Sequence, residues 1–98
     1  MAVAFIQEFA IVNDDHYTTN YDAIAERLGT DPPDGAIVHT AGFDDEAGVF
    51  RIFDVWESKE QAERFVNERV MPLVAELAPD AAQPTRHGYY ELHDLVKA

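Results

Sequence analysis

The stretch AIVHTAGFDDEAGVFRIFDVWES, residues 36–58, decides the fold. Two runs rich in β-branched and aromatic residues, Ala36–Phe43 and Val49–Glu57, flank the polar segment Asp44–Gly48. That segment has hairpin length and ends in glycine, which is typical of the connection between two paired strands. The stretch therefore predicts two neighbouring antiparallel strands.

A helix is expected directly after this hairpin, beginning at Ser58. Ser58 and Gln61 have the S-x-x-Q spacing of a capping box, which satisfies free backbone donors at a helix start. Apolar residues then recur at helical spacing. They are Ala62, Phe65, Val66, Val70, Leu73 and Leu77. Pro72 lacks a backbone donor and clashes with the carbonyl four residues earlier, so we expect a kink near Glu68–Met71.

Three further elements surround this central part. Val3–Val12 reads as a strand that is largely apolar on both faces, and the polar residues Asn13–Asp15 break it. Thr19–Leu28 has helical periodicity and ends before a glycine. Gly88–Val96 reads as the last strand.

The order strand, helix, strand, strand, helix, strand predicts one α+β domain over residues 1–98. Right-handed crossovers give a ferredoxin-like β-α-β-β-α-β fold, with a four-stranded antiparallel sheet and both helices on one face. The run Val49–Trp56 places apolar residues on both faces of its strand. Soluble monomers avoid leaving such a face in water, so the pattern predicts a homodimer in which the uncovered faces meet.

Composition excludes several classes of site and partner. The chain has no cysteine, which excludes disulfides, thiolate metal sites and cysteine nucleophiles. It carries 19 acidic and seven basic residues, a net charge of −12, which disfavours nucleic acid and anionic membranes as partners. Such acidity suits a halophilic source and also a mesophilic one with acidic proteins. Without a signal peptide or a long apolar run, the chain is expected to be cytoplasmic.

Several stretches of the sequence resemble a known protein family. Gly35–Gly42, Arg51–Ser58 and a following helix with Phe65 and Arg69 resemble the small dimeric α/β-barrel proteins of the antibiotic biosynthesis monooxygenase (ABM) superfamily. The ending Asp54-Val55-Trp56 of the third strand is the most telling part. The resemblance spans nearly the whole chain and implies an ABM-like dimeric α/β barrel, a fold that hosts many chemistries.

The resemblance also bears on the activity. Haem-degrading members use a histidine on the second helix as iron ligand, and none lies between Ser58 and Pro79. Quinone-forming members use neither metal nor flavin. They hold a phenolic substrate with Trp, Tyr, Asn and Arg side chains, and the carbanion of this substrate reacts with oxygen. The side chains that correspond to this substrate-binding set are Trp56, Tyr21, Tyr90 and Arg51. No cofactor is expected, and the four scattered histidines do not have metal-ligand spacing.

His39 and Asp54 are the candidate catalytic pair. They lie on the two strands of the hairpin. The strands can pair in two registers that differ by one residue, and one of these places His39 and Asp54 on the same face as Trp56. A carboxylate beside an imidazole raises the basicity of the imidazole and fixes its tautomer, as a general base requires. The alternative is a buried hydrogen bond that only satisfies two polar side chains.

Two functions remain open on these grounds. One is a cofactor-independent enzyme, a monooxygenase or proton-transfer enzyme, with His39 and Asp54 as base and Trp56, Tyr21 and Phe65 as walls around a small aromatic or apolar substrate. The other is a non-catalytic dimeric module that binds a metabolite or a partner. An open cavity with polar groups would favour the enzyme, and one filled by Phe, Ile and Trp side chains would favour the module.

Overall fold

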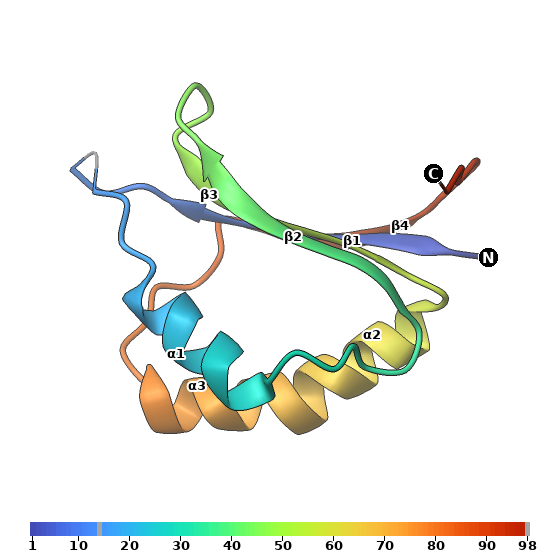
Figure 1. Ribbon diagram of the computed structural model, residues 1–98. Coiled ribbons are helices and arrows are strands. Elements are labelled where there is room, and N and C mark those ends of the chain that lie inside the picture. The colour runs from blue at the N-terminus through green and yellow to red at the C-terminus, as the bar shows by residue number, and fades with distance from the viewer. Residues whose placement is uncertain (14, 98) are drawn as a thin grey trace.

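The structure, a computed structural model, describes residues 1–13 and 15–97. Four strands and a set of helical segments follow one another in the expected β-α-β-β-α-β order (Figure 1). The elements are β1 (Val3–Ala10), α1 (Thr19–Leu28), β2 (Ala36–Asp44), β3 (Val49–Trp56), α2 (Lys59–Phe65), η1 (Val66–Val70), α3 (Met71–Leu77) and β4 (Arg86–Glu91). The ferredoxin-like α+β class is thereby confirmed.

The four strands form one antiparallel sheet in the order β2-β3-β1-β4. In the β2–β3 hairpin His39 pairs directly with Asp54, and the register shifts by one residue between Ala36 and Val38. Phe5 of β1 pairs with Asp54 from the other side. The register therefore brings His39 and Asp54 to the same face of the sheet.

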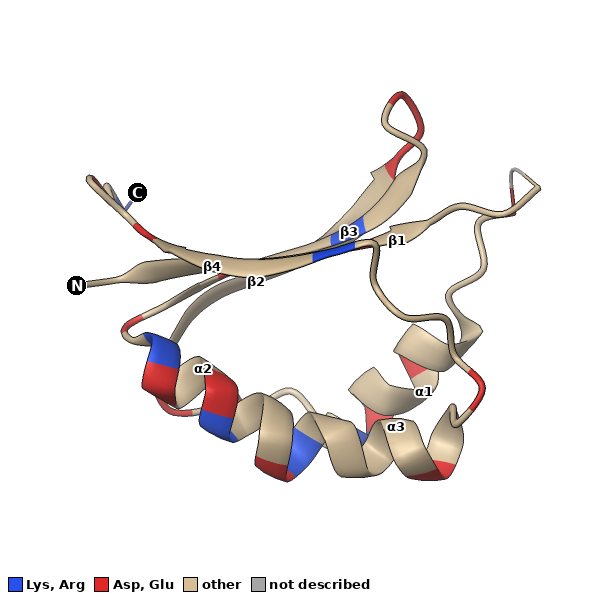
Figure 2. Ribbon diagram, turned by 180° about the vertical axis from the view of Figure 1, so that it is seen from behind, with Lys and Arg blue, Asp and Glu red and all other residues tan. Residues whose placement is uncertain are grey.

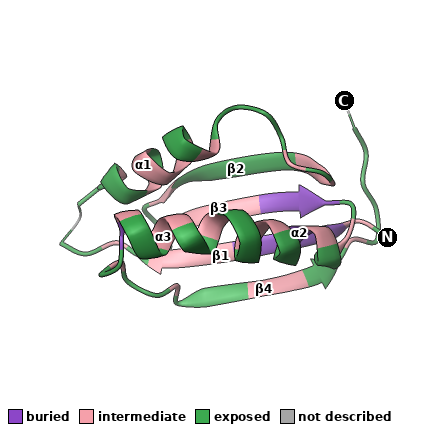
Figure 3. Ribbon diagram, turned by 90° about the horizontal axis from the view of Figure 1, so that it is seen from below, coloured by how far each residue is buried: buried purple, intermediate pink, exposed green. Residues whose placement is uncertain are grey.

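All the described helices lie on one face of the sheet (Figures 1 and 3). α1 is tied to α3 by an exposed ion pair between Arg27 and Glu76, 2.6 Å apart. Acidic and basic residues both occur on the helix layer, and acidic residues lie at the tip of the β2–β3 hairpin (Figure 2). The opposite face of the sheet, called the outer face below, carries no helix among the described residues.

The buried core lies at one end of the sheet, beneath α2. Val3, Phe5, Trp56 and Ala62 form its buried cluster, and partly buried apolar residues pack against it. In Figure 3 the buried parts of β1 and β3 lie toward this end. The rest of the space between helices and sheet is less completely filled, and this unfilled part contains the candidate site.

The second helix begins and is interrupted where the sequence indicates. Ser58 caps α2, since its Oγ accepts a hydrogen bond from the Gln61 backbone N–H at 3.2 Å. The interruption takes the form of a π-helical turn, η1, directly before α3, and Pro72 sits in the first turn of α3. A widened turn accommodates a proline that cannot donate a backbone hydrogen bond.

All four strands differ from their expected bounds, β2 and β3 by only one residue, since β2 ends at Asp44 rather than Phe43 and β3 at Trp56 rather than Glu57. β1 ends at Ala10 rather than at Val12; Asn13 has a positive φ of 56°, and Asp14 of the expected break lies outside the described residues. β4 spans Arg86–Glu91 rather than Gly88–Val96. The reason is that Glu91 pairs with Val3, the first residue of β1, so the residues after Glu91 have no partner strand.

Among the described residues, no helix is both long and apolar enough to cross a membrane.

Candidate functional site

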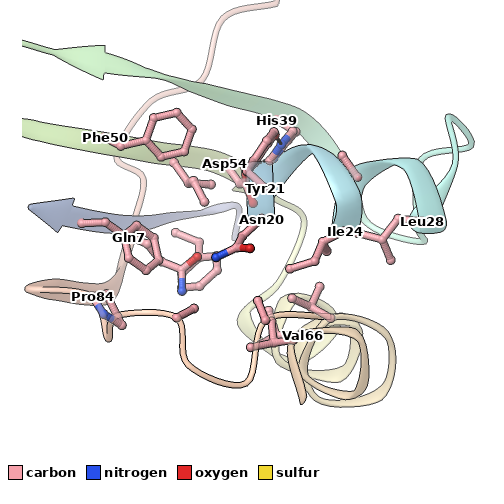
Figure 4. A pocket seen from close by; sticks show the side chains of 18 of the residues that line it. Gln7, Asn20, Tyr21, Ile24, Leu28, His39, Phe50, Asp54, Val66 and Pro84 are labelled. Atoms are coloured by element: carbon pink, nitrogen blue, oxygen red, sulfur yellow. Dashed lines mark hydrogen bonds and ion pairs between the residues drawn. The ribbon is translucent and has the colours of Figure 1, made fainter. Parts of the chain in front are cut away.

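A cavity of about 920 Å³ separates the helices from the sheet. Its walls come from β1, β2 and β3 on one side and from α1, η1 and α3 on the other (Figure 4). Most lining side chains are apolar, among them Phe9, Ile24 and Val66. A space of this size is within the range of small-molecule sites, which are concave and mostly apolar with a few placed polar groups.

One group of polar side chains in this wall forms a continuous chain of hydrogen bonds. Asp54 Oδ1 lies 2.5 Å from His39 Nδ1, and His39 Nε2 lies 2.5 Å from the hydroxyl of Tyr21. Figure 4 shows the three side chains together at the cavity wall, where α1 faces β2 and β3. The structure thus joins the two candidate catalytic residues and adds Tyr21 to them.

Burial differs along this chain. Asp54 is buried, with 7% of the residue exposed, whereas the His39 side chain is about half exposed, at 53%. A buried carboxylate is stabilised by a hydrogen-bond donor, and the nearest donor here is the imidazole N–H. Nδ1 of His39 therefore carries the hydrogen and donates it to Asp54, which leaves Nε2 of the neutral ring as an acceptor for the Tyr21 hydroxyl.

The surroundings shift the pKa of both titratable partners of the carboxylate. The hydrogen bond to Asp54 raises the pKa of His39 above 6.5, and the charge of Asp54 adds to the effect, while partial burial opposes it. Burial raises the pKa of Tyr21 above 10.0, and the negative charges of Asp54 and Asp22 raise it further. Near neutral pH the tyrosine is thus protonated, and the imidazole is a stronger base than a free histidine.

Trp56 and Phe65 lie in the cavity wall as expected. Their ring centroids are 5.5 Å apart with a tilt of 40° between the planes, and Trp56 is only 3% exposed. The ring contributes to the cavity wall, and its indole N–H is a buried donor without a partner among the described residues.

Arg51 and Tyr90 do not reach the cavity, contrary to the expectation that they would bind substrate. Both project from the outer face of the sheet. The guanidinium of Arg51 pairs there with Glu8 at 2.6 Å and with Asp44 at 2.8 Å. Tyr90 pairs with Ala4 in the sheet and is half exposed. The alternation of side chains along a strand separates these two residues from the helix-facing site.

Gln7 and Asn20 are among the polar groups of the cavity that sequence reasoning missed. Gln7 of β1 and Asn20 of α1 both line it (Figure 4). The signal for Gln7 is present in the sequence, because it is the one polar residue between Phe5 and Phe9 on an otherwise apolar strand face. Asn20 follows no pattern of this kind, and only the position of α1 over the sheet brings it to the cavity.

Within the described residues, no three His, Asp or Glu side chains gather closely enough to hold a metal ion. The polar groups of the cavity that are hydrogen-bonded to one another are the tyrosine, the imidazole and the carboxylate.

Fold and site together define a ferredoxin-like α+β domain with an apolar cavity between helices and sheet. Solved structures share this fold over nearly their whole length. A candidate antibiotic biosynthesis monooxygenase from Chloroflexus aurantiacus superposes with a TM-score of 0.70 at 15% identity, covering 99% of this chain and 98% of that one.

Two further structures extend the comparison. Rv0793 from Mycobacterium tuberculosis gives a TM-score of 0.63 at 18% identity, with 100% and 99% of the two chains covered. SnoaB, a cofactor-independent oxygenase from Streptomyces nogalater, superposes with a TM-score of 0.61 at 16% identity, covering 99% of this chain and 98% of that one. No family profile matches the chain, and no curated protein does. These structures confirm the expected ferredoxin-like fold.

Proposed function

We propose that this chain is a cofactor-independent enzyme that removes a proton from a small aromatic or apolar molecule. The observation that carries the proposal is the 2.5 Å contact between His39 Nδ1 and Asp54 Oδ1 in the wall of the cavity. Such a pair is a general base whose tautomer and basicity are set by the carboxylate. The proton lost by the substrate ends on His39, and Asp54 stabilises the resulting imidazolium.

The cavity supports a substrate of this chemistry. It is open rather than filled by aromatic side chains, and its walls are mostly apolar. An apolar enclosure strengthens the attraction between imidazolium and substrate anion, because less water screens their charges. A substrate carbanion formed there reacts with dioxygen without a cofactor, and one structure of the same fold is described as a cofactor-independent oxygenase. This is the monooxygenase form of the proposal.

A second candidate is a non-catalytic module that binds a metabolite. The observation in its favour is that Tyr21, His39 and Asp54 satisfy one another's hydrogen bonds. A satisfied network of this kind can rigidify a wall without any chemistry. The two candidates differ in what the loss of His39 does, since a module needs no base.

We also propose that the working form is a homodimer whose two outer sheet faces meet. The support is apolar surface on that face: Val38 is 44% and Tyr90 49% exposed, and the buried apolar residues Val55 and Ala4 lie between them in the same row of the sheet. The charges beside this surface are already paired within the chain, because Arg51 binds Glu8 and Asp44. A second copy is the partner that presents an identical apolar surface.

Proton abstraction can be tested without knowing the natural substrate. The probe is 2-tetralone, a bicyclic aromatic ketone whose acidic C–H bonds exchange with deuterium in D₂O, followed by NMR. We expect the protein to accelerate this exchange and His39→Ala to reduce the acceleration by about 100-fold or more, the usual contribution of a general base. A parallel thermal-shift screen of phenols and quinones ranks ligands of the cavity.

His93→Ala is the matched control, because His93 is exposed and lies beyond the end of β4. It should leave the exchange rate unchanged, and thermal melting should show that both variants are folded. Exchange in the wild type no faster than in buffer, or undiminished exchange in His39→Ala, would contradict the proposed enzyme.

A further inference from the structure

We propose that Tyr21 is a catalytic residue, and that its hydroxyl passes the proton between the substrate and His39. The inference rests on the proposed function and assigns the group that touches the substrate. The sequence predicts Tyr21 as a substrate-binding residue and a wall of the cavity, and the structure places its hydroxyl 2.5 Å from the nitrogen that would act as base.

The hydrogen bonds around His39 leave it no free nitrogen. Nδ1 donates to the buried carboxylate of Asp54, and the lone pair of Nε2 accepts from the Tyr21 hydroxyl. A neutral imidazole has one donor and one acceptor, so both are in use. A substrate in the cavity therefore meets the oxygen of Tyr21 before it meets the base.

The ring of Tyr21 is fixed in this position by its neighbours. It lies nearly coplanar with the imidazole of His39, with 4° between the planes, and makes an edge contact with Phe50 at a centroid distance of 5.5 Å. The ring itself lines the cavity, and α1 holds it over the sheet (Figure 4). The hydroxyl oxygen keeps a second lone pair that Nε2 does not occupy, and a substrate proton can bind there.

The proposed step moves two protons in one direction. The substrate C–H or O–H bond breaks, its electron pair stays on the substrate, and its proton binds the Tyr21 oxygen. The former hydroxyl proton of Tyr21 moves to Nε2 of His39. Tyrosine ends neutral, the substrate carries one negative charge, and the imidazolium carries one positive charge, which the Asp54 carboxylate balances. No oxidant or reductant takes part in this step.

The charges around the site agree with a relay in which both protons move together. Burial and the negative charges of Asp54 and Asp22 raise the pKa of Tyr21, so a lasting phenolate is disfavoured. The hydrogen bond to Asp54 raises the pKa of His39, so the proton is favoured on the imidazole. Tyr21 then transfers the proton, and His39 is its final acceptor.

The test removes one oxygen atom. Tyr21→Phe should lower the protein-catalysed deuterium exchange of 2-tetralone by about 100-fold, the usual loss when an acid–base group is deleted. Tyr90→Phe removes the same atom on the outer face, outside the cavity, and should leave the rate unchanged. The NMR titration of the His39 imidazole is measured in the same variants, since the pKa of His39 is raised chiefly by Asp54 and should stay raised in Tyr21→Phe.

Loss of exchange with the pKa of His39 still raised supports the relay. A rate in Tyr21→Phe equal to that of the wild type overturns it. Loss of exchange together with a fall in the pKa of His39 also overturns it, because Tyr21 would then only hold the pair in place. If His39→Ala retains full exchange as well, it is the proposed function that fails, which separates the two failures.

Discussion

At the scale of single residues, the site depends on three side chains that are far apart in the sequence. Asp54 is buried and fixes the hydrogen of His39, and His39 in turn orients the hydroxyl of Tyr21. Each hydrogen bond sets the donor or acceptor role of the next group, as in other acid–base networks. The chemistry proposed for the cavity follows from this order of roles.

The proposed role of His39 as a base predicts a definite pH dependence of the exchange rate. The pKa of His39 is raised above 6.5, and only neutral His39 can accept a proton, so catalysed exchange should rise with pH and reach half its maximum above pH 6.5. The linked stability runs the other way: because the folded-state pKa is raised, the stabilisation from the pair is fully present below pH 6.5 and is lost as pH rises through that pKa.

Asp54→Asn provides the control for this prediction. The carboxylate is the main cause of the raised pKa of His39, and this variant removes it. Burial, which lowers the pKa of His39, remains. The NMR titration midpoint of His39 should therefore move to lower pH in this variant. An unchanged midpoint would show that the carboxylate does not set the basicity of the imidazole.

At the scale of elements, the long second helix is what closes the cavity. It starts at a regular cap, passes through the π-helical turn η1 and continues as α3. Both η1 and α3 contribute cavity residues, among them Val66, Val70 and Val74. A π-helical turn changes which residues face the sheet, and such turns are frequent at functional sites. The interruption near Pro72 thus shapes the wall opposite the Tyr21–His39–Asp54 chain.

The cap of α2 should contribute measurably to stability. Ser58 Oγ accepts from the Gln61 backbone N–H and donates to the Gln61 side chain at 2.9 Å. Ser58→Ala should lower the free energy of unfolding by about 1 kcal/mol, as measured by urea denaturation. Thr18→Ala is the matched control. Thr18 makes no capping bond to the backbone of α1, and its hydroxyl makes only an exposed hydrogen bond to Asp22 at 2.8 Å, so Thr18→Ala should lower the free energy of unfolding clearly less. An equal decrease in the free energy of unfolding in both variants would show that the Ser58 cap is not what stabilises α2.

At the scale of the whole molecule, one sheet serves two purposes. Its helix-facing side forms the floor of the cavity, and its outer face carries exposed apolar residues beside a paired set of charges. The net charge of −12 makes two copies repel each other at long range, so the proposed dimer would depend on contact at this apolar face. The acidic side chains of the helix layer lie on the other side (Figure 2).

The dimer can be tested at its proposed interface. Val38→Glu places a new negative charge on the outer face, where burial without a partner is costly, and should convert the dimer to a monomer. Val12→Glu adds the same charge at a more exposed valine that follows β1 and lies off the sheet, and should leave the dimer intact. Gel filtration with light scattering gives the molar mass of each variant and distinguishes a dimer from a monomer. A wild-type monomer, or a dimeric Val38→Glu, would contradict the interface.

Much of this molecule could be predicted from local sequence patterns. The order of elements, the β2–β3 hairpin and the cap of α2 follow from turn residues, strand composition and helical spacing. Each of these signals lies within a few neighbouring residues, so each acts before distant parts of the chain meet. The bounds of α1 agree with the expected Thr19–Leu28 for the same reason.

The site required the tertiary structure. The sequence allowed two registers for His39 and Asp54, and only strand pairing selected the one that brings them together. The register of β4 on β1 decided that Tyr90 faces away from the cavity, and the position of α1 over the sheet brought Tyr21 to His39. These outcomes depend on contacts between residues many positions apart. By itself, then, the sequence determined the elements and their order, because those are local; the folded chain decided which side chains meet, because that depends on register and packing.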